Sequence, residues 1–407
     1  MDSYRRFESM QSTLLQANPF YRSRLARNPA FSDLPFTSKD EIIQDQSNHP
    51  PFGTNLTYPV ESYTRMHQTS GTAGRPMLWL DTPESWDWFL RCWEEVYRSA
   101  GVRTGDTVYV AFSFGPFIGF WGAFEAAQRM KVMVLSGGGQ STSQRLRAIL
   151  ERQATVLVCT PTYALRLAEA AAEEGLDTRS SSVRVTIHAG EPGASIPSVR
   201  KRIQDLWGAR TYDHTGMTEI GAYGFECEMQ AGVHINEDEF IAEVIDPATL
   251  HPVEEGQRGE LVLTNLGRIG TPLIRYRTGD LVILSREPCA CGRKSARMVG
   301  GLLGRADDMI TVRGVNLFPS AIENIIRRHP EVVEFSIEVV PHRQMQELAL
   351  KLELQNDADG AEVVERIGHE LLLDLHIRAV IECVPAGQLP RFELKSRRTR
   401  VVDPSGI

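Results

Sequence analysis

The sequence predicts an α/β protein with a large N-terminal domain and a small, mobile α+β domain at the C-terminal end. In the large domain we expect parallel sheets covered by helices, because short β-rich runs alternate with helical stretches between residues 107 and 262. A β-rich subdomain with Gly and Pro turns follows from residue 241, and the pattern changes again after residue 304. At roughly 150 residues per domain, 407 residues allow two or three folding units. We therefore expect domains at residues 1–306 and 307–407.

The expected strands of the large domain are short runs of β-branched and apolar residues. Between them lie segments with helical periodicity, such as residues 143–152 and 162–175. The expected strands cover residues 108–112, 132–135, 156–159 and 183–187. In the small domain, the sequence predicts helices at 319–328 and 361–376 and strands at 335–340, 348–354 and 380–384.

The composition is that of a globular protein and argues against two kinds of partner. Hydrophobic residues make up 42% of the chain and charged residues 24%. A net charge of -8 disfavours nucleic acid, which needs a basic surface. The uncharged stretch at 108–124 contains Gly and Pro and is shorter than the ~20 residues of a membrane span. We expect a buried strand, a loop and a helix there, and neither a nucleic-acid nor a membrane partner. The polar start of the chain also lacks the apolar run of a signal peptide.

The cysteines indicate a reducing compartment, most simply the cytoplasm. Six cysteines are too few for a disulfide framework in a chain of this length. Cys92, Cys159 and Cys383 occur in apolar or mixed runs, where we expect reduced core residues.

Four further residues have the composition of a metal site. Cys227, His234, Cys289 and Cys291 supply three thiolates and an imidazole, which suit tetrahedral structural Zn²⁺. The alternative is a turn with free thiols, because the spacing matches no finger motif and Cys289 and Cys291 are separated by a single residue.

Residues 68–76, Gln-Thr-Ser-Gly-Thr-Ala-Gly-Arg-Pro, have the character of an anion-binding loop. Small hydroxylated residues around two glycines expose backbone N–H groups and hydroxyls, and Arg75 adds a positive charge. Such a loop suits the β- and γ-phosphates of ATP, although it lacks the Gly-Lys-Ser/Thr ending of a Walker loop. The alternative is a simple hairpin turn.

Two other motifs present carboxylates beside glycines. Residues 212–219, Tyr-Asp-His-Thr-Gly-Met-Thr-Glu, place Glu219 directly after the hydroxyl of Thr218, which suits a Mg²⁺–phosphate site. A helix start at this point is the alternative. Residues 276–281 form a turn that presents Asp280, which suits the hydroxyls of a ribose.

These motifs occur in an order that resembles the adenylate-forming superfamily of acyl-CoA synthetases, peptide-synthetase adenylation domains and luciferases. Residues 304–308, Gly-Arg-Ala-Asp-Asp, and 390–395, Pro-Arg-Phe-Glu-Leu-Lys, complete the series. Within the superfamily, residues 34–39, 232–238 and 289–293 resemble the phenylacetate–CoA ligase family, whose members in some cases have similar Cys and His positions. The resemblance extends from about residue 20 to Asp403.

The resemblance implies a nucleotide site. Gly190 and Glu191 would lie on the adenine side, with Tyr212 and Asp213 before the second motif. Thr218 would contact phosphate and Glu219 would bind Mg²⁺, while Asp280 would bind the ribose hydroxyls, with Arg305 nearby. The phosphate loop would consist of Ser70, Gly71, Thr72, Gly74 and Arg75.

The resemblance also implies a moving C-terminal domain. Asp307 would be the hinge, Lys395 would bridge the carboxylate and the α-phosphate, and Gly314 would allow close approach of the pantetheine arm of CoA. Two departures from the family are visible. Thr215 stands where relatives place an aromatic residue, and residues 392–394 before Lys395 are larger than usual and lack a glycine.

The implied reaction converts a carboxylic acid and ATP, with Mg²⁺, into an acyl-AMP and transfers the acyl group to CoA. An alternative acceptor is the thiol of an acyl carrier protein. A third possibility is a non-catalytic remnant, against which the presence of Glu219, Asp280 and Lys395 argues. The sequence names neither the acid nor the oligomeric state, and a homodimer stays open.

The acid is expected to be aromatic, because residues 112–122 interleave aromatic residues with glycines after a strand. This composition suits a flat apolar slot. The alternative is that these aromatic residues belong to the core. The residues expected to line the slot are Phe114, Phe117, Trp121 and Gly138, with His214 and Thr215 near a polar ring substituent.

Overall fold

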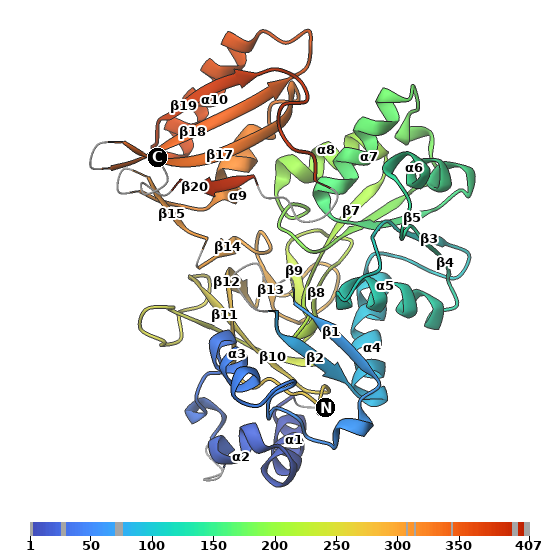
Figure 1. Ribbon diagram of the computed structural model, residues 1–407, viewed down its shortest axis with the longest axis vertical. Helices are drawn as coiled ribbons and strands as arrows, with labels where there is room; N and C mark the ends of the chain where they lie inside the picture. Colours follow the sequence, from blue (N-terminus) through green and yellow to red (C-terminus); the bar gives the residue numbers. More distant parts are fainter. Residues whose placement is uncertain are drawn as a thin grey trace.

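The computed structural model in Figure 1 describes residues 3–25, 30–69, 76–306, 308–312, 315–342, 345–392 and 398–402. Three helices begin the chain, α1 (Ser3–Ala17), α2 (Pro19–Leu25) and α3 (Lys39–Asn48). Ser38 and Glu41 form a capping box that starts α3. Short 3-10 helices occur at Phe31–Asp33, Val60–Ser62 and Thr178–Ser180.

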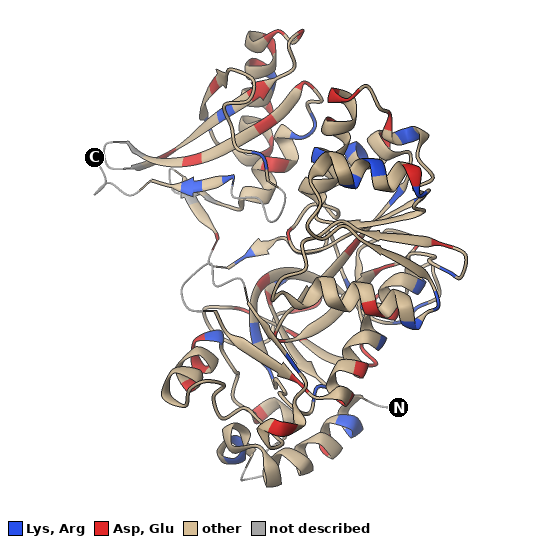
Figure 2. Cartoon of the chain, turned by 45° about the vertical axis from the view of Figure 1, so that its right-hand side comes forward, with Lys and Arg blue, Asp and Glu red and all other residues tan. Residues whose placement is uncertain are grey.

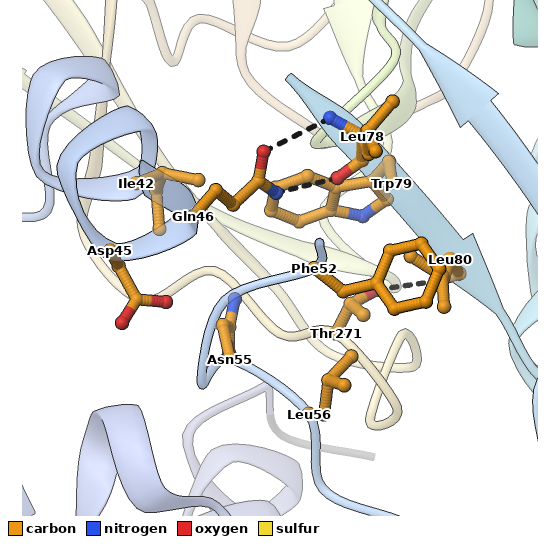
Figure 3. A pocket seen from close by; sticks show the side chains of 10 residues that line it. All are labelled: Ile42, Asp45, Gln46, Phe52, Asn55, Leu56, Leu78, Trp79, Leu80 and Thr271. Carbon is orange, nitrogen blue, oxygen red and sulfur yellow. Dashed lines mark hydrogen bonds between the residues drawn. The ribbon is translucent and has the colours of Figure 1, made fainter. Parts of the chain in front are cut away.

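A two-stranded antiparallel hairpin encloses the glycine-rich loop. Its strands are β1 (Arg65–Gln68) and β2 (Leu78–Asp81), and α4 (Pro83–Ser99) follows. Figure 3 shows how α3 supports β2: the side-chain amide of Gln46 donates to Leu78 O at 2.7 Å and accepts from Leu78 N at 3.1 Å. The adjacent cavity, about 10 Å³ in volume, has room for about one water molecule and is not a substrate site.

The expected parallel strands are confirmed. β3 (Thr107–Val110), β4 (Met133–Ser136), β5 (Val156–Cys159), β6 (Val185–His188) and β7 (Arg210–Met217) lie in the order β4-β3-β5-β6-β7. The helices that connect or flank them are α5 (Ile118–Arg129), α6 (Thr142–Glu151), α7 (Pro161–Glu173) and α8 (Pro197–Trp207). Residues 108–124 thus form a strand, a loop and a helix, as expected. In the described part of the chain, no helix is long and apolar enough to cross a membrane.

The β-rich part continues the same sheet instead of forming a separate one. β7 turns into β8 through an antiparallel hairpin, and the full sheet contains 12 strands in mixed orientation. The alternative of a helix start at residues 218–219 is therefore wrong, because these residues form the turn between β7 and β8. The remaining strands are β8 (Gly221–Glu226), β9 (Val233–Ile235), β10 (Phe240–Ile245), β11 (Arg258–Asn265), β12 (Tyr276–Ser285), β13 (Arg297–Met298) and β14 (Gly304–Arg305).

The C-terminal part has its own sheet and its own apolar core (Figure 1). Four strands lie in the order β19-β18-β17-β20, and helices α9 and α10 accompany them. The expected helices and strands are confirmed, whereas the hairpin β15-β16 and the edge strand β20 were not predicted. The elements are β15 (Ile310–Val312), β16 (Val315–Leu317), α9 (Pro319–Ile326), β17 (Val332–His342), β18 (Met345–Leu354), α10 (Gly360–Leu375), β19 (Ala379–Val384) and β20 (Thr399–Val401).

One cysteine departs from expectation. Cys92 and Cys159 are buried and free, as predicted, but Cys383 is exposed. It lies on β19, which has a neighbouring strand on one side only, so the prediction of a core position was wrong. In the cartoon of Figure 2, acidic and basic residues are interspersed along the chain in both parts of the molecule.

Candidate active site

Asp280 lies on β12 where the pairing with β11 is irregular. The register shifts between Glu260 and Val262, and Gly279 has a φ of +75°, a conformation that favours glycine. A Cβ at Gly279 would lie 2.8 Å from the guanidinium of Arg305. The expected turn at residues 276–281 is therefore wrong, because these residues form a bulged part of β12, and glycine at position 279 permits both the bulge and the close approach of Arg305.

The carboxylate of Asp280 is held in a fixed position. It is 5% exposed, Tyr223 donates to its Oδ2 at 3.4 Å, and Arg305 Nη1 lies 3.6 Å from its Oδ1. Arg305 is opposite Asp280 in the β12–β14 pairing. Asp280 and Arg305, predicted as ribose-binding residues, are thus brought together.

Glu219 lies in the β7–β8 turn and is 7% exposed. The hydroxyl of Tyr276 on β12 donates to Glu219 Oε1 at 2.9 Å. Burial, and next the charge of Glu219, raise the pKa of Tyr276 well above its ordinary value, so the phenol stays a proton donor. The carboxylate oxygens of Glu219 are hard ligands of the kind that Mg²⁺ prefers.

The turn that carries Thr218 and Glu219 rests on a buried ion pair. Arg268 donates to Asp81 through Nε at 2.7 Å and through Nη2 at 2.5 Å, and both side chains are completely buried. The third guanidinium nitrogen of Arg268, Nη1, donates to Thr218 O at 2.6 Å. Arg268 thereby ties the end of β2 to the turn. Sequence reasoning missed this pair, and the only signal was a charged residue within an apolar segment.

The glycine-rich loop lies between two fixed ends. Thr69 N donates to Met77 O at 3.0 Å, and Met77 N donates to Thr69 Oγ1 at 3.0 Å. Gln68 N donates to Pro116 O at 2.9 Å, so the end of β1 lies beside the predicted acyl segment. The loop itself lies outside the described residues, as do the predicted hinge, CoA and lysine positions. The predicted site residues in this group are Ser70, Gly71, Thr72, Gly74, Arg75, Asp307, Gly314 and Lys395.

The predicted adenine-side residues gather at the carboxyl ends of β6 and β7. Gly190 and Glu191 follow β6, and Tyr212 and Asp213 belong to β7, whose residues pair with β6 in parallel. Ligands of such sheets bind at this edge. Ser195 donates a short hydrogen bond to Asp213. Tyr212 is buried, with its ring near Arg210.

Two buried carboxyl groups beside this edge have pKa values above their ordinary range. Burial raises the pKa of Asp213 to about 6 and that of Glu226 to about 7. Glu226 accepts from Asp213 N at 3.0 Å and from Arg200 at 2.7 Å. These contacts orient Asp213 on the strand.

Three of the predicted acyl-pocket residues lie together. The rings of Phe114 and Trp121 are 4.9 Å apart and edge to face, and a Cβ on Gly138 would lie 2.9 Å from the ring of Phe114. Trp121 Nε1 donates to Gly115 O at 3.0 Å. Phe117 lies at the start of α5, half-buried.

Arg145 organises the loops around this aromatic cluster and was missed by sequence reasoning. Its buried guanidinium donates to Gly137 O at 2.9 Å, to Tyr163 Oη at 2.8 Å and to Ser113 Oγ at 3.2 Å. The loops that follow β3 and β4 are therefore held by one side chain. The helical position of Arg145 gave no signal of this contact.

His214 and Thr215 are buried in the β7–β8 hairpin. The His214 ring lies 4.3 Å from the Trp93 ring, and its Nδ1 is 2.6 Å from Gly224 O. Burial lowers the pKa of His214 to about 4, so the ring is neutral at pH 7. His214 packs against Trp93 of α4 and contacts Gly224 of β8, and the role of His214 and Thr215 toward an acid stays a prediction.

The four predicted metal ligands converge. Their ligand atoms lie within 4.8 Å of one another, with 3.8 Å between Cys227 Sγ and Cys289 Sγ and 3.6 Å between Cys291 Sγ and His234 Nε2. Tetrahedral zinc places two sulfur ligands about 3.8 Å apart and a sulfur and a nitrogen about 3.5 Å apart. His234 Nδ1 lies 3.0 Å from Ser295 Oγ, a contact that leaves Nε2 directed at the cysteines. Donor types and distances both fit zinc.

The mixed sheet with Glu219 and Asp280 beside it, and the separate small C-terminal part, agree with the class expected from the sequence, the adenylate-forming enzymes. The model of the AMP-binding enzyme family matches residues 55–267, and the model of the AMP-binding enzyme C-terminal domain matches residues 314–404. The chain belongs to the AMP-binding enzyme family, as its sequence motifs predicted.

Individual relatives span nearly the whole chain. A phenylacetate-coenzyme A ligase of Thermus thermophilus is 33% identical over 91% of this chain and 86% of its own. A solved structure of 2-hydroxyisobutyryl-CoA ligase, in the postadenylation state with 2-HIB-AMP, has a TM-score of 0.92 at 30% identity and covers 98% of this chain and 88% of its own. The same ligase in the thioesterification state has a TM-score of 0.71, with 98% and 90% coverage.

Proposed function

We propose that this protein is an AMP-forming ligase that activates an aromatic carboxylic acid as acyl-AMP and transfers the acyl group to CoA. The observation that carries the proposal is the similarity to phenylacetate-coenzyme A ligases over about nine-tenths of the chain. The cluster of Phe114, Trp121 and Gly138 supports an acid with a ring. CoA is favoured over a carrier protein, because the relatives that span nearly the whole chain are phenylacetate-coenzyme A ligases and the similar solved structure is a CoA ligase.

In the first step, an oxygen of the acid's carboxylate attacks the α-phosphate of ATP, the bond from the α-phosphorus to the β-phosphate oxygen breaks, and pyrophosphate leaves. The carboxylate is already ionised at pH 7, so no general base is required. The barrier is the approach of like charges, which Arg75 and Lys395 would neutralise. Bound Mg²⁺ would supply further charge neutralisation, with Glu219 as its protein ligand. Asp280 would hold the ribose hydroxyls, which fixes the nucleotide while the acid attacks.

In the second step, the CoA thiol attacks the acyl carbonyl and AMP leaves. This step requires residues 307–407 to rotate against residues 1–306, with Asp307 as the hinge and Gly314 along the path of the pantetheine arm. The separate apolar cores of the two parts support this division. A cytoplasmic location is proposed from the free cysteines.

We also propose that Cys227, His234, Cys289 and Cys291 hold a structural Zn²⁺. The four ligands come from the end of β8, from β9 and from the loop before β13, so the metal would tie three segments of the sheet together. No open coordination position is left, which is typical of structural sites.

One experiment tests the proposed reaction. Pyrophosphate exchange is measured with phenylacetate, benzoate, anthranilate, salicylate, 2-hydroxyisobutyrate, acetate and octanoate, and thioester formation is then measured with CoA. We expect phenylacetate or a benzoate to give the highest kcat/KM, because burial of a ring contributes roughly 25 cal/mol per Å². 2-Hydroxyisobutyrate is included because a ligase of the corresponding thioester has the similar fold described above. A higher value for 2-hydroxyisobutyrate, acetate or octanoate would contradict the aromatic pocket.

A further inference from the structure

The guanidinium of Arg398 lies at the contact between the C-terminal part and α7. It donates to Glu334 through Nε at 2.6 Å and through Nη2 at 3.0 Å, and through Nη1 to Thr162 Oγ1 at 3.1 Å. The side chain is 5% exposed and packs over the ring of Phe335. Glu334 belongs to the C-terminal part, whereas Thr162 belongs to the N-terminal part, so only one of these three bonds crosses between them.

Arg398 is fixed to the C-terminal sheet independently of Thr162. Its carbonyl accepts from Ile337 N on β17 at 2.7 Å, and β20 continues directly after it in parallel with β17. The predicted catalytic Lys395 lies only a few residues earlier in the chain. The position of Arg398 against α7 therefore constrains where the lysine-bearing segment ends.

Thr162 connects this contact to the nucleotide side of the sheet. It lies in the first turn of α7, which follows β5, and its N–H donates to Glu191 Oε1 at 3.0 Å. Glu191 belongs to the predicted adenine-side loop. Two residues, Arg398 and Thr162, thus join the end of the lysine-bearing segment to that loop.

Further contacts between the two parts lie on the same side, on α7 and α8 (Figure 1). Arg202 Nη1 donates to Val332 O at 2.9 Å, and Ser198 Oγ donates to Asn324 Oδ1 at 2.9 Å. These bonds join α8 to β17 and α9. They describe one particular orientation of the C-terminal part.

That orientation resembles one state of a solved relative. The TM-score against 2-hydroxyisobutyryl-CoA ligase is 0.92 in its postadenylation state and 0.71 in its thioesterification state. Rotation of the C-terminal part carries Arg398 and Glu334 together, because they are bonded within that part. The bonds from Arg398 to Thr162 and from Arg202 to Val332 join different parts and would be lost on such a rotation.

We propose that Arg398 and Thr162 are positioning residues that hold the C-terminal part in the orientation for acyl-AMP formation. The ion pair with Glu334 orients the Arg398 guanidinium. The hydroxyl of Thr162 accepts a hydrogen bond from this guanidinium in the orientation that places Lys395 at the nucleotide. Loss of this bond favours the other orientation and leaves the second step intact. This inference rests on the proposed two-step function.

The test measures the two half-reactions separately in the Thr162→Val variant. This substitution removes the hydroxyl and keeps the shape of the side chain. Pyrophosphate exchange with phenylacetate measures the first step, and thioester formation from supplied phenylacetyl-AMP and CoA measures the second. Loss of a hydrogen bond to a charged group changes the equilibrium constant between the two orientations by about tenfold. We expect exchange to fall about tenfold, with the second step unchanged or faster. Thr162→Ser, which keeps the hydroxyl, should retain the wild-type ratio of the two rates.

Arg202→Met provides a second, independent variant and should shift the ratio in the same direction. Arg366→Met is the matched control, because Arg366 pairs with Glu331 at 2.6 Å entirely within the C-terminal part. An equal loss of both steps in Thr162→Val, or an unchanged ratio, would overturn the positioning role. If the wild-type protein lacks both half-reactions with every acid of the panel, the proposed function itself fails, which is a distinguishable result.

Discussion

The hydroxyl of Tyr276 donates to Glu219 Oε1 at 2.9 Å and so joins β12 to the turn between β7 and β8. The same strand carries Asp280, whose carboxylate accepts from Tyr223 on β8. Two tyrosine–carboxylate hydrogen bonds therefore relate the predicted Mg²⁺ ligand to the predicted ribose ligand. Asp280 is held by strand pairing, whereas Glu219 lies in the β7–β8 turn and is held by its hydrogen bond to the strand residue Tyr276.

Tyr276→Phe should weaken acyl-AMP formation without unfolding the protein. The change removes the hydrogen bond that orients Glu219, and a bond to a charged group contributes about 1.5–3 kcal/mol. We expect kcat/KM for ATP to fall about tenfold or more, with a higher Mg²⁺ requirement in pyrophosphate exchange. Tyr97→Phe is the control, because Tyr97 is buried and donates to Ala123 O on α5. Equal effects of both changes would contradict an orienting role.

Lys395→Ala should abolish the first half-reaction selectively. The lysine charge is needed where the carboxylate meets the α-phosphate, so exchange is expected to fall by several orders of magnitude. Thioester formation from supplied acyl-AMP should survive. Exchange near the wild-type rate would refute the assignment of Lys395.

The purified protein should contain about one zinc per chain by elemental analysis. Cys289→Ser removes one of the four predicted ligands and should lower both the zinc content and Tm, because the proposed metal would tie three segments together. Cys383→Ser serves as the control, since Cys383 is exposed on β19. A metal-free protein with an unchanged Tm would exclude the zinc site.

Protonation of His214 should lower the stability of the protein between pH 6.5 and pH 4. Burial lowers the pKa of His214 from 6.5 to about 4. Between these values the unfolded chain binds the extra proton and the folded chain does not, so stability present above pH 6.5 is lost as the pH falls. The contribution is about 3 kcal/mol at most.

His214→Gln removes this group, and its urea midpoint should depend less on pH over the same range, whatever its stability at pH 7. His251→Gln, at an exposed position, is the control and should retain the full pH dependence. Parallel curves for His214→Gln and the wild type would contradict the assignment.

Much of the fold follows from local patterns in the sequence. The runs at 156–159 and 348–354 became β5 and β18, because a β-rich segment between helical segments can bury its apolar side chains only in a covered sheet. The motifs around Glu219 and Asp280 also identified the family, since the order of such motifs is a property of the chain alone. The spacing of Cys227, His234, Cys289 and Cys291, in contrast, left two interpretations open.

Only the tertiary structure decided which of these residues meet. Arg268 pairs with Asp81 across 187 positions and Tyr276 reaches Glu219 across 57, and no local pattern encodes such distances. The fold brings the four predicted metal ligands within 4.8 Å of one another, and it places Arg398 against Thr162. Periodicity and capping act within a few residues, so the sequence by itself determined the elements and the chemical groups. Which of these groups come into contact was determined by the burial of apolar faces against elements that are distant in the sequence. The free energy of that burial depends on the assembled core and not on one segment.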